Sequence, residues 1–427
     1  MSKLVVKNGR VVDPSQELDR VCDVGIEDDV ILEIEDGIST VGCEQFDASG
    51  LVVAPGFIDM HVHLREPGFE HAETIETGSR AAAAGGFTSI CCMPNTEPVN
   101  DKPTVTSYII DRARRSAIVN VYPIGAITKN SAGKELSAIA SMKQAGIVAI
   151  SDDGKPVMNA RVLRRAMEFA QALNIPLIQH CEDLDLSAGG LMHEGLESTR
   201  LGLRGIPRTS EDVMVARDIL LAELTGARYH VAHVSSKNSV EMVAFAKRRG
   251  LPVTCEATPH HFALCDSEMR PYDSNFKMKP PLRERCDLEA ITQGIVHGVI
   301  DAIATDHAPH PGDEKMQEFE RCPFGIIGLE TALGLGLERL YHSDKIDISR
   351  LISLFSKKPA EILSLDRGTL RVGAAADITI FDLERDWTYD VNRSPSKSRN
   401  TPFHRHKFRG GPVATIVAGQ IVWRLEA

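Results

Sequence analysis

Residues 56–68 of the chain read GFIDMHVHLREPG, an apolar run that ends in two histidines and an arginine. His61 and His63 are two positions apart, and on a strand residues i and i+2 point to the same face, so both imidazoles can reach one ion. Buried parallel strands read as near-continuous apolar runs. The stretch therefore predicts a buried strand whose carboxyl end is able to bind a metal.

Seven further apolar runs resemble this strand, at residues 87–93, 119–127, 147–151, 176–180, 228–234, 252–257 and 299–306. Most of them precede helical patterns of ten or more residues, several of which end at a glycine that can cap the helix. Eight β-α units over roughly 300 residues predict an α/β fold, the (β/α)8 TIM barrel. A doubly wound open sheet is the alternative, but no G-x-G-x-x-G turn follows the first strand and no Walker sequence is found.

The two ends of the chain read as β structure instead. Near the start, LVVK and RVVD flank Asn8-Gly9, a two-residue hairpin signal, and VGIEDDVILEI is a second hairpin candidate. Near the other end, ADITIFDL and PVATIVAGQIVWR alternate like strands. Neither piece has enough apolar surface alone. We therefore expect residues 1–54 and 366–427 to pair into one small β-sandwich-like domain, with the barrel over residues 55–365.

Charge and cysteine content exclude several classes of protein. The chain has 48 basic and 59 acidic residues, a net charge of −11, which argues against a nucleic-acid-binding protein and leaves a small anionic substrate open. Its nine cysteines contain no C-x-x-C pair, which argues against a disulfide framework or a structural zinc site and favours a reducing compartment. No run approaches the ~18 apolar residues of a spanning helix. We expect a cytoplasmic protein with no membrane partner.

Metal-capable side chains end five of the eight predicted strands. They are His61, His63, Asp153, His180, His233 and Asp306. Because active sites of TIM barrels lie at the carboxyl ends of the strands, these six predict a metal site, and imidazole with carboxylate suits Zn²⁺, with Mn²⁺ or Co²⁺ as substitutes. Six ligands can hold two ions if one carboxylate bridges them. Asp153 is the bridging candidate; its neighbour Asp152 must point the other way if the strand continues, and a carboxylated Lys155 is the alternative bridge.

The chain resembles the class I dihydroorotases of bacteria, which belong to the amidohydrolase superfamily. Besides the first strand, the resemblance lies in MPNTEPV (93–99), SDDG (151–154), QHCED (179–183), HVSS (233–236), EATPHH (256–261), KPPLR (279–283), ATDHAPH (304–310), PFGIIGLETAL (323–333) and NTPF (400–403). The H-x-H pair alone indicates only the superfamily. The R-E-P-G and D-H-A-P-H motifs are far more specific, and the resemblance covers essentially the whole chain.

The resemblance implies a role for each of these residues. His61 and His63 would bind one zinc ion, His180 and His233 the other, and Asp153 would bridge the two. Asp306 would be both a ligand of the first ion and the catalytic acid/base. The substrate-binding positions are His63, Arg65, Asn95 and His310, together with the backbone of Phe324 and Gly325. Lys279 stands where many members have a substrate-binding asparagine; it would contact the substrate carboxylate or turn away.

The implied reaction is the reversible, zinc-dependent cyclisation of N-carbamoyl-L-aspartate to (S)-dihydroorotate in pyrimidine biosynthesis. Both compounds carry a carboxylate, which the planar fork of Arg65 can hold through two hydrogen bonds. Another cyclic amidohydrolase, such as a dihydropyrimidinase, hydantoinase or allantoinase, is the nearest alternative, but those relatives generally use a carboxylated lysine as the bridge. An inactive homologue that scaffolds aspartate transcarbamoylase is a further one, although such a chain should have lost ligands.

Two expectations concern the assembly and the loop after the last strand. We expect a homo-oligomer, and the sequence leaves association with aspartate transcarbamoylase open. The polar segment between His310 and Pro323 is either a mobile lid over bound substrate or a plain solvated loop.

Overall fold

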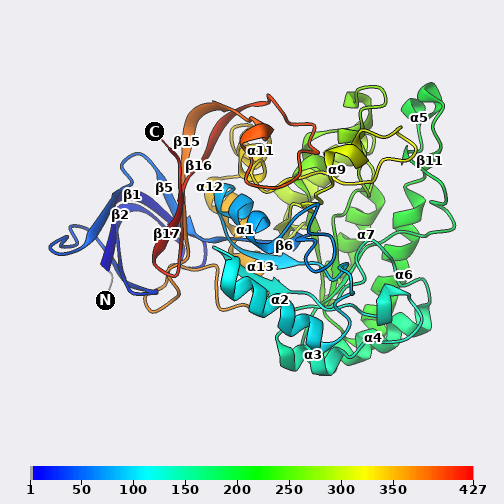
Figure 1. Cartoon of the computed structure of the whole chain (residues 1–427), viewed down its shortest axis with the longest axis horizontal. Helices are drawn as coiled ribbons and strands as arrows, with labels where there is room; N and C mark the ends of the chain where they lie inside the picture. The colour runs from blue at the N-terminus through cyan, green and yellow to red at the C-terminus, as the bar shows by residue number, and fades with distance from the viewer. Residues whose placement is uncertain (1–2, 427) are drawn as a thin grey trace.

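The computed structural model describes residues 3–426 and shows a barrel of parallel strands beside a second, larger sheet (Figure 1). The barrel wall contains β6 (Phe57–Val62), β7 (Phe87–Cys92), β8 (Asn120–Pro123), β9 (Leu177–Gln179), β12 (Tyr229–Val231), β13 (Val253–Ala257) and β14 (Ala302–Ile303). These strands form two parallel sheets, ordered β6-β7-β8 and β9-β12-β13-β14. Three single-residue bridges join the sheets and close the wall: Gly125 with Ile150, Ile150 with Leu177, and Val62 with His307. The predicted TIM barrel is confirmed.

The fourth segment of the wall is shorter than the sequence predicts. In place of a strand over residues 147–151, Ile150 alone bridges both neighbours. Backbone hydrogen bonds still flank it, since Ser151 N–H donates to Gly125 O (2.9 Å) and Ile178 N–H donates to Ile150 O (2.8 Å). The chain turns away directly afterwards. This turn carries the second half of the predicted SDDG motif into the barrel mouth.

Helices cover the barrel from outside (Figure 1). They are α1 (Ile75–Ala84), α2 (Pro103–Ser116), α3 (Ile139–Ala145), α4 (Ala160–Ala172), α5 (Leu196–Leu201), α6 (Thr209–Thr225), α7 (Lys237–Arg248), α8 (Pro259–Ala263), α9 (Arg285–Val296), α10 (Gly312–Lys315), α11 (Ala332–Gly336), α12 (Ile348–Phe355) and α13 (Lys357–Leu363). Polar side chains cap several of them at the first turn. The Thr74 hydroxyl accepts from Thr77 N–H before α1, and Asn159 Oδ1 accepts from Arg161 N–H before α4.

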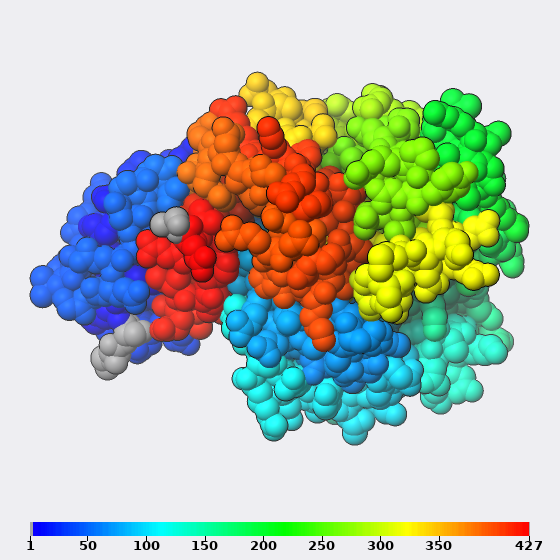
Figure 2. Space-filling model, turned by 45° about the horizontal axis from the view of Figure 1, so that its top comes forward, coloured from blue at the N-terminus to red at the C-terminus, as the bar shows by residue number. Residues whose placement is uncertain are grey.

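Both ends of the chain contribute to the second sheet, as predicted. Its strands run in the order β17-β16-β15-β5-β1-β2-β3, with β4 beside β1. Their bounds are β1 (Lys3–Asp13), β2 (Leu18–Glu27), β3 (Val30–Glu35), β4 (Glu44–Asp47), β5 (Val52–Pro55), β15 (Ile378–Thr388), β16 (Lys407–Val417) and β17 (Gln420–Arg424). The antiparallel pair β5–β15 joins the two ends. In Figure 2 the surfaces of the N-terminal part (blue) and the C-terminal part (red) of the chain adjoin at one end of the molecule.

The hairpin predicted at Asn8-Gly9 is wrong. β1 runs straight through this pair and remains beside β2, with a register shift between Val6 and Gly9 that marks a bulge. Asn8 takes the left-handed conformation (φ 60°), as it would in a turn, but the packing of Gly9 decides the outcome. A Cβ at Gly9 would lie 2.4 Å from Val53 Cγ2, so the glycine serves close packing against β5. The second predicted hairpin is confirmed, with β2 and β3 joined by residues 28–29.

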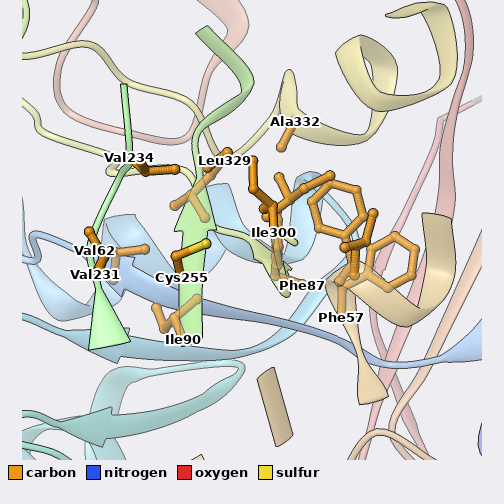
Figure 3. Packing of buried hydrophobic residues seen from close by; sticks show 14 of the residues in the cluster. Phe57, Val62, Phe87, Ile90, Val231, Val234, Cys255, Ile300, Leu329 and Ala332 are labelled. Atoms are coloured by element: carbon orange, nitrogen blue, oxygen red, sulfur yellow. The ribbon is translucent and has the colours of Figure 1, made fainter. Parts of the chain in front are cut away.

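One buried cluster connects the barrel with the second sheet, and another fills the barrel. At the start of β6 and β7, Phe57 and Phe87 pack edge to face (Figure 3). The Phe57 ring also lies 6.0 Å from the Phe381 ring of β15, which ties the barrel to the sheet. A second cluster fills the barrel with residues from most wall segments, among them Met60, Cys91, Ile124, Ala149, Ile178 and Ala302. Within residues 3–426, no helix is long and apolar enough to cross a membrane.

Candidate active site

A cavity of about 410 Å³ opens where the barrel strands end. Ten of the residues singled out from the sequence line it: His63, Arg65, Asn95, Asp153, His180, His233, Lys279, Asp306, His310 and Phe324. A second cavity of about 390 Å³ shares four lining residues with it, so the two form one continuous cleft. Two other predicted site residues lie just behind the lining. His61 is fully buried, and Gly325 packs against His310.

The six predicted metal ligands form one buried cluster. They fall into three overlapping groups of three, and the donor atoms within each group lie within 4.8 Å of one another. Asp153 stands at the centre: its Oδ1 lies 3.3 Å from His61 Nε2 and 3.6 Å from His233 Nε2, and its Oδ2 lies 3.4 Å from His63 Nε2. Asp306 Oδ1 lies 2.9 Å from His63 Nε2 on the other side.

The cluster fits a metal site, because several of its buried atoms lack a hydrogen-bond partner. Among the described residues, His61 Nε2 and Asp153 Oδ1 have none, although they lie only 3.3 Å apart. A buried polar atom without a partner costs about 1–3 kcal/mol, so two of them facing each other in one cluster indicate that a cation completes it. Burial would raise the pKa of Asp153, but the neighbouring imidazoles lower it well below its usual range, which keeps the carboxylate in the form that binds metal.

The structure distinguishes Asp153 from its two alternatives. Asp152 points away from the cluster, where its Oδ1 accepts a hydrogen bond from Thr128 N–H (3.0 Å). Lys155 is exposed and lines only the second cavity, the one of about 390 Å³. The aspartate at 153 is thus the one placed among the imidazoles.

Glu256 of β13 supports the cluster from behind and was missed in the sequence. This fully buried carboxylate lies 2.7 Å from His61 Nδ1 and 3.3 Å from His230 Nε2. Burial would raise the pKa of Glu256, but the two histidines lower it well below its usual range. A signal was present, since a glutamate inside a predicted buried strand requires a partner. Here the partner is the far nitrogen of a predicted ligand, which fixes the ring orientation.

Glu182 contacts both His180, another predicted ligand, and Lys279, the lysine at the position where many family members have asparagine. Its Oε2 lies 3.1 Å from His180 Nε2, and its Oε1 accepts from Lys279 Nζ (2.7 Å). Burial would raise the pKa of Glu182, but His180 and Lys279 lower it well below its usual range. Lys279 also lies over the Phe324 ring, 5.0 Å from its centroid, so its ammonium is directed into the cavity wall.

The opposite wall of the cavity carries the predicted substrate-binding side chains. Asn95 Oδ1 lies 2.9 Å from His63 Nδ1, and Arg65 Nε donates to Pro309 O (3.2 Å). His310 Nε2 lies 2.9 Å from Phe324 O, to which it donates. Burial, together with Arg65 and Lys315, lowers the pKa of His310 to about 3, so the imidazole is neutral at physiological pH. Arg65 thus provides a fixed positive charge beside the neutral imidazole of His310.

Two buried lysines beneath this wall hold residues 319–325 in place, and sequence reasoning missed both. Lys277 Nζ donates to Phe319 O (2.5 Å) and Cys322 O (2.7 Å). Lys315 Nζ donates to Pro323 O (3.0 Å) and Gly325 O (3.2 Å). Burial lowers the pKa of Lys315 to about 8. The loop that follows His310 is therefore anchored along its second half.

The chain closely resembles curated bacterial enzymes over its whole length. Residues 50–239 match the dihydro-orotase-like family, and residues 320–423 match the amidohydrolase family. The chain is 66% identical over 424 residues to the dihydroorotase of Solibacter usitatus and 52% identical over 422 residues to that of Citrifermentans bemidjiense, with 99% of both chains covered in each case. The chain belongs to the dihydroorotase family. As a dihydroorotase it is a hydrolase of cyclic amides.

Solved structures of other cyclic amidohydrolases share the fold of this dihydroorotase. The L-hydantoinase of Arthrobacter aurescens is 25% identical with a TM-score of 0.88, and the alignment covers 99% of this chain and 96% of that one. The dihydropyrimidinase of Brevibacillus agri is 23% identical with a TM-score of 0.86, and 99% and 95% of the two chains are covered. The barrel with a sheet built from both chain ends is therefore the hydantoinase-like fold.

Proposed function

We propose that the chain catalyses the reversible cyclisation of N-carbamoyl-L-aspartate to (S)-dihydroorotate, with two Zn²⁺ ions per chain. The observation that carries this proposal is the position of Arg65, a guanidinium that lines the same cavity as the ligand cluster. Both compounds carry a carboxylate, and a guanidinium binds carboxylate through two parallel hydrogen bonds. A neutral hydantoin or dihydropyrimidine ring would gain nothing from this charge.

In this proposal, one ion is bound by His61, His63 and Asp306, the other by His180 and His233, and Asp153 bridges the two. When bound, the ions would supply a water of lowered pKa and polarise the amide carbonyl. Glu256 and Glu182 keep their respective histidines in a fixed orientation. His61 Nε2 and Asp153 Oδ1, which lack a hydrogen-bond partner, support this assignment.

Asp306 is proposed as the catalytic acid/base. It lies 2.9 Å from His63 Nε2 and lines the cavity, within reach of both the ligand cluster and a bound ring. In ring opening, its carboxylate accepts a proton from the attacking water and then donates it to the ring nitrogen that leaves. In ring closure, the same group removes the proton from the carbamoyl nitrogen as this nitrogen attacks the carboxyl carbon, and it returns the proton to the oxygen that leaves that carbon as water.

The substrate carboxylate is proposed to bind Arg65, with Asn95 and His310 beside it. His63, a member of the cluster, links it to this group, because its Nδ1 lies 2.9 Å from Asn95 Oδ1. The backbone of Phe324 and Gly325 is proposed to contact the ring amide. Lys279 adds a second positive charge to the opposite wall, although Glu182 pairs with it. The open form carries one carboxylate more than the ring, so cyclisation is favoured at lower pH.

The test is a turnover assay with dihydroorotate, dihydrouracil and allantoin side by side, for the native chain and for Arg65→Met. We expect the native chain to prefer dihydroorotate, and the variant to lose at least about tenfold in kcat/KM for it, because an unpaired substrate carboxylate costs roughly 2–5 kcal/mol. A native preference for either neutral ring would contradict the proposal. Arg80→Met, on the exposed face of α1, is the control that removes a guanidinium elsewhere.

We further propose a homo-oligomer in the cytoplasm. Sedimentation of the pure chain measures its mass, and sedimentation with added aspartate transcarbamoylase tests the association that some members of the family show. A monomer at all concentrations would contradict the first part.

A further inference from the structure

Asn400 is a buried amide that reaches the active site from the C-terminal part of the chain. Residues 389–406 leave the sheet after β15 and return to it at β16, and between them Asn400 is only 2% exposed. Its Nδ2 donates to Ala308 O (2.9 Å) and to Gly325 O (3.0 Å), and its Oδ1 accepts from His310 N–H (3.1 Å). An amide has two N–H donors and one carbonyl, and all three are used here.

These three contacts join two segments that line the cavity. One follows β14 and carries His310; the other carries Phe324 and Gly325. They also pair with each other, since Ala308 N–H donates to Ile326 O (3.0 Å). The backbone of Asn400 continues the pattern, because its carbonyl accepts from Ile327 N–H (2.9 Å). The amide thus adds three hydrogen bonds to the direct pairing of the two segments.

Position 325 has no room for a side chain where the two segments meet. Its φ is 154°, and a Cβ there would lie 2.6 Å from Ala308 O and 2.7 Å from His310 Cδ2. The two segments therefore touch backbone to backbone. Gly325 O also accepts from Lys315 Nζ (3.2 Å), whereas Asn400 is the side chain that pairs with Ala308 O and with His310 N–H. A carboxylate at 400 would oppose both carbonyls, and an apolar side chain would leave Ala308 O and His310 N–H without this buried partner.

We propose that Asn400 is a positioning residue that fixes His310 relative to the Phe324-Gly325 backbone, and so sets substrate affinity without touching the substrate. The inference rests on the proposed substrate roles of these three residues. A displacement of about 1 Å in a binding group can cost up to about 10²-fold in rate. The effect should fall on KM, because the metal ligands and Asp306 make no contact with the amide.

The test compares Asn400→Ala with the native chain, both loaded with zinc. We expect KM for dihydroorotate to rise at least about tenfold while kcat changes less than about threefold, with bound zinc unchanged. The amide proton of His310 should exchange faster in the variant. Asn120→Ala is the matched control: its Nδ2 donates to Thr88 O (2.9 Å) and Asp377 Oδ2 (2.9 Å) at the other end of the barrel, so it should lower Tm without raising KM.

His310→Ala is measured in parallel to separate the two proposals. A raised KM in His310→Ala with an unchanged KM in Asn400→Ala would overturn the positioning role alone. An unchanged KM in His310→Ala would overturn the proposed substrate site, and the inference with it. If Asn400→Ala does not fold, the nearly isosteric Asn400→Asp carries the test by the same criteria, since it keeps the acceptor for His310 and loses both donors.

Discussion

Glu256 shows how much of a metal site lies behind its ligands. Its Oε1 is 2.7 Å from His61 Nδ1, whereas the opposite ring nitrogen of His61 faces Asp153. A carboxylate in this position fixes the tautomer of the ring and raises its basicity toward a metal. The contribution of Glu256 to zinc affinity can be measured without a turnover assay.

We predict that Glu256→Gln weakens zinc binding about 10–100-fold, because the amide keeps the shape of the side chain but loses its charge. Competition with a chromophoric chelator measures the affinity. Glu211→Gln is the matched control, since Glu211 is equally buried but bonds Ser235 and Ser236 N–H instead of a ligand. Equal affinities in the native chain and Glu256→Gln would contradict the role assigned to Glu256.

That these six side chains gather in one buried cluster could be predicted from sequence, whereas the contacts of the residues behind them could not. His61 and His63 were identified by their spacing on a predicted strand, and the other four residues by their position at the ends of predicted strands. Glu182 and Asn400 lie in quoted motifs, but their contacts depend on residues about 90 positions away, such as Lys279 for Glu182 and His310 for Asn400. No local pattern specifies such a pairing.

At the scale of elements, the loop after His310 is defined by the lysines beneath it. Lys315 ends the short helix α10, and its ammonium is held by carbonyls of residues 323 and 325. Burial lowers its pKa to about 8, below the 10.5 of an ordinary lysine. Between these two pH values the unfolded chain binds more protons than the folded one, so the contribution of this group to stability rises with pH.

We therefore predict that the free energy of unfolding of the native chain rises relative to that of Lys315→Met as the pH goes from 7.5 to 10. The shift in pKa limits the gain to about 3 kcal/mol. Urea unfolding of both proteins at each pH, at equal zinc concentration, measures the difference. Lys134→Met, at an exposed position, is the control that removes a lysine elsewhere. A flat difference for Lys315→Met would contradict the prediction.

Element boundaries were predicted less well than element types. Residues 147–151 were predicted as a strand because they are apolar, but only Ile150 bridges the neighbours, since the chain must turn to bring Asp153 inward. Asn8-Gly9 has the chemistry of a turn, yet tertiary packing against Val53 keeps β1 continuous. In both places a long-range contact overrides the local signal.

At the scale of the whole molecule, the metal site joins segments spread over most of the chain. Its ligands extend from His61 on β6 to Asp306 after β14, so bound ions tie several wall segments together. We predict that removal of zinc with a chelator abolishes turnover and lowers Tm, and that about two equivalents of Zn²⁺ restore both. At a free zinc concentration of 100 Kd, one site adds about 2.7 kcal/mol to the free energy of unfolding.

Calorimetry with stepwise addition of Zn²⁺ measures both the number of ions and the change in Tm. Saturation at one equivalent of Zn²⁺ would contradict the proposal that Asp153 bridges two ions. A Tm that does not change on chelation would show that the barrel closes without help from the cluster. Mg²⁺, which prefers oxygen ligands, is the control ion and should restore neither property.

The overall architecture followed from the pattern of apolar runs. Eight such runs with helices between them predicted the barrel, and too little apolar surface at either end predicted that the ends pair. The β5–β15 pair confirms this joining. The domain boundaries after residues 54 and 365 stay a prediction.

The sheet shared by the two ends has a consequence for how the chain is made. During synthesis β5 emerges more than 300 residues before its neighbour β15, and until then it presents an unpaired strand edge of the kind that recruits other chains. Every residue that lines the cavity beside the cluster is also translated before Asn400. The contact that joins Ala308, His310 and Gly325 can therefore form only after all of these residues have been made, so it is the last part of the cavity wall to be completed during synthesis.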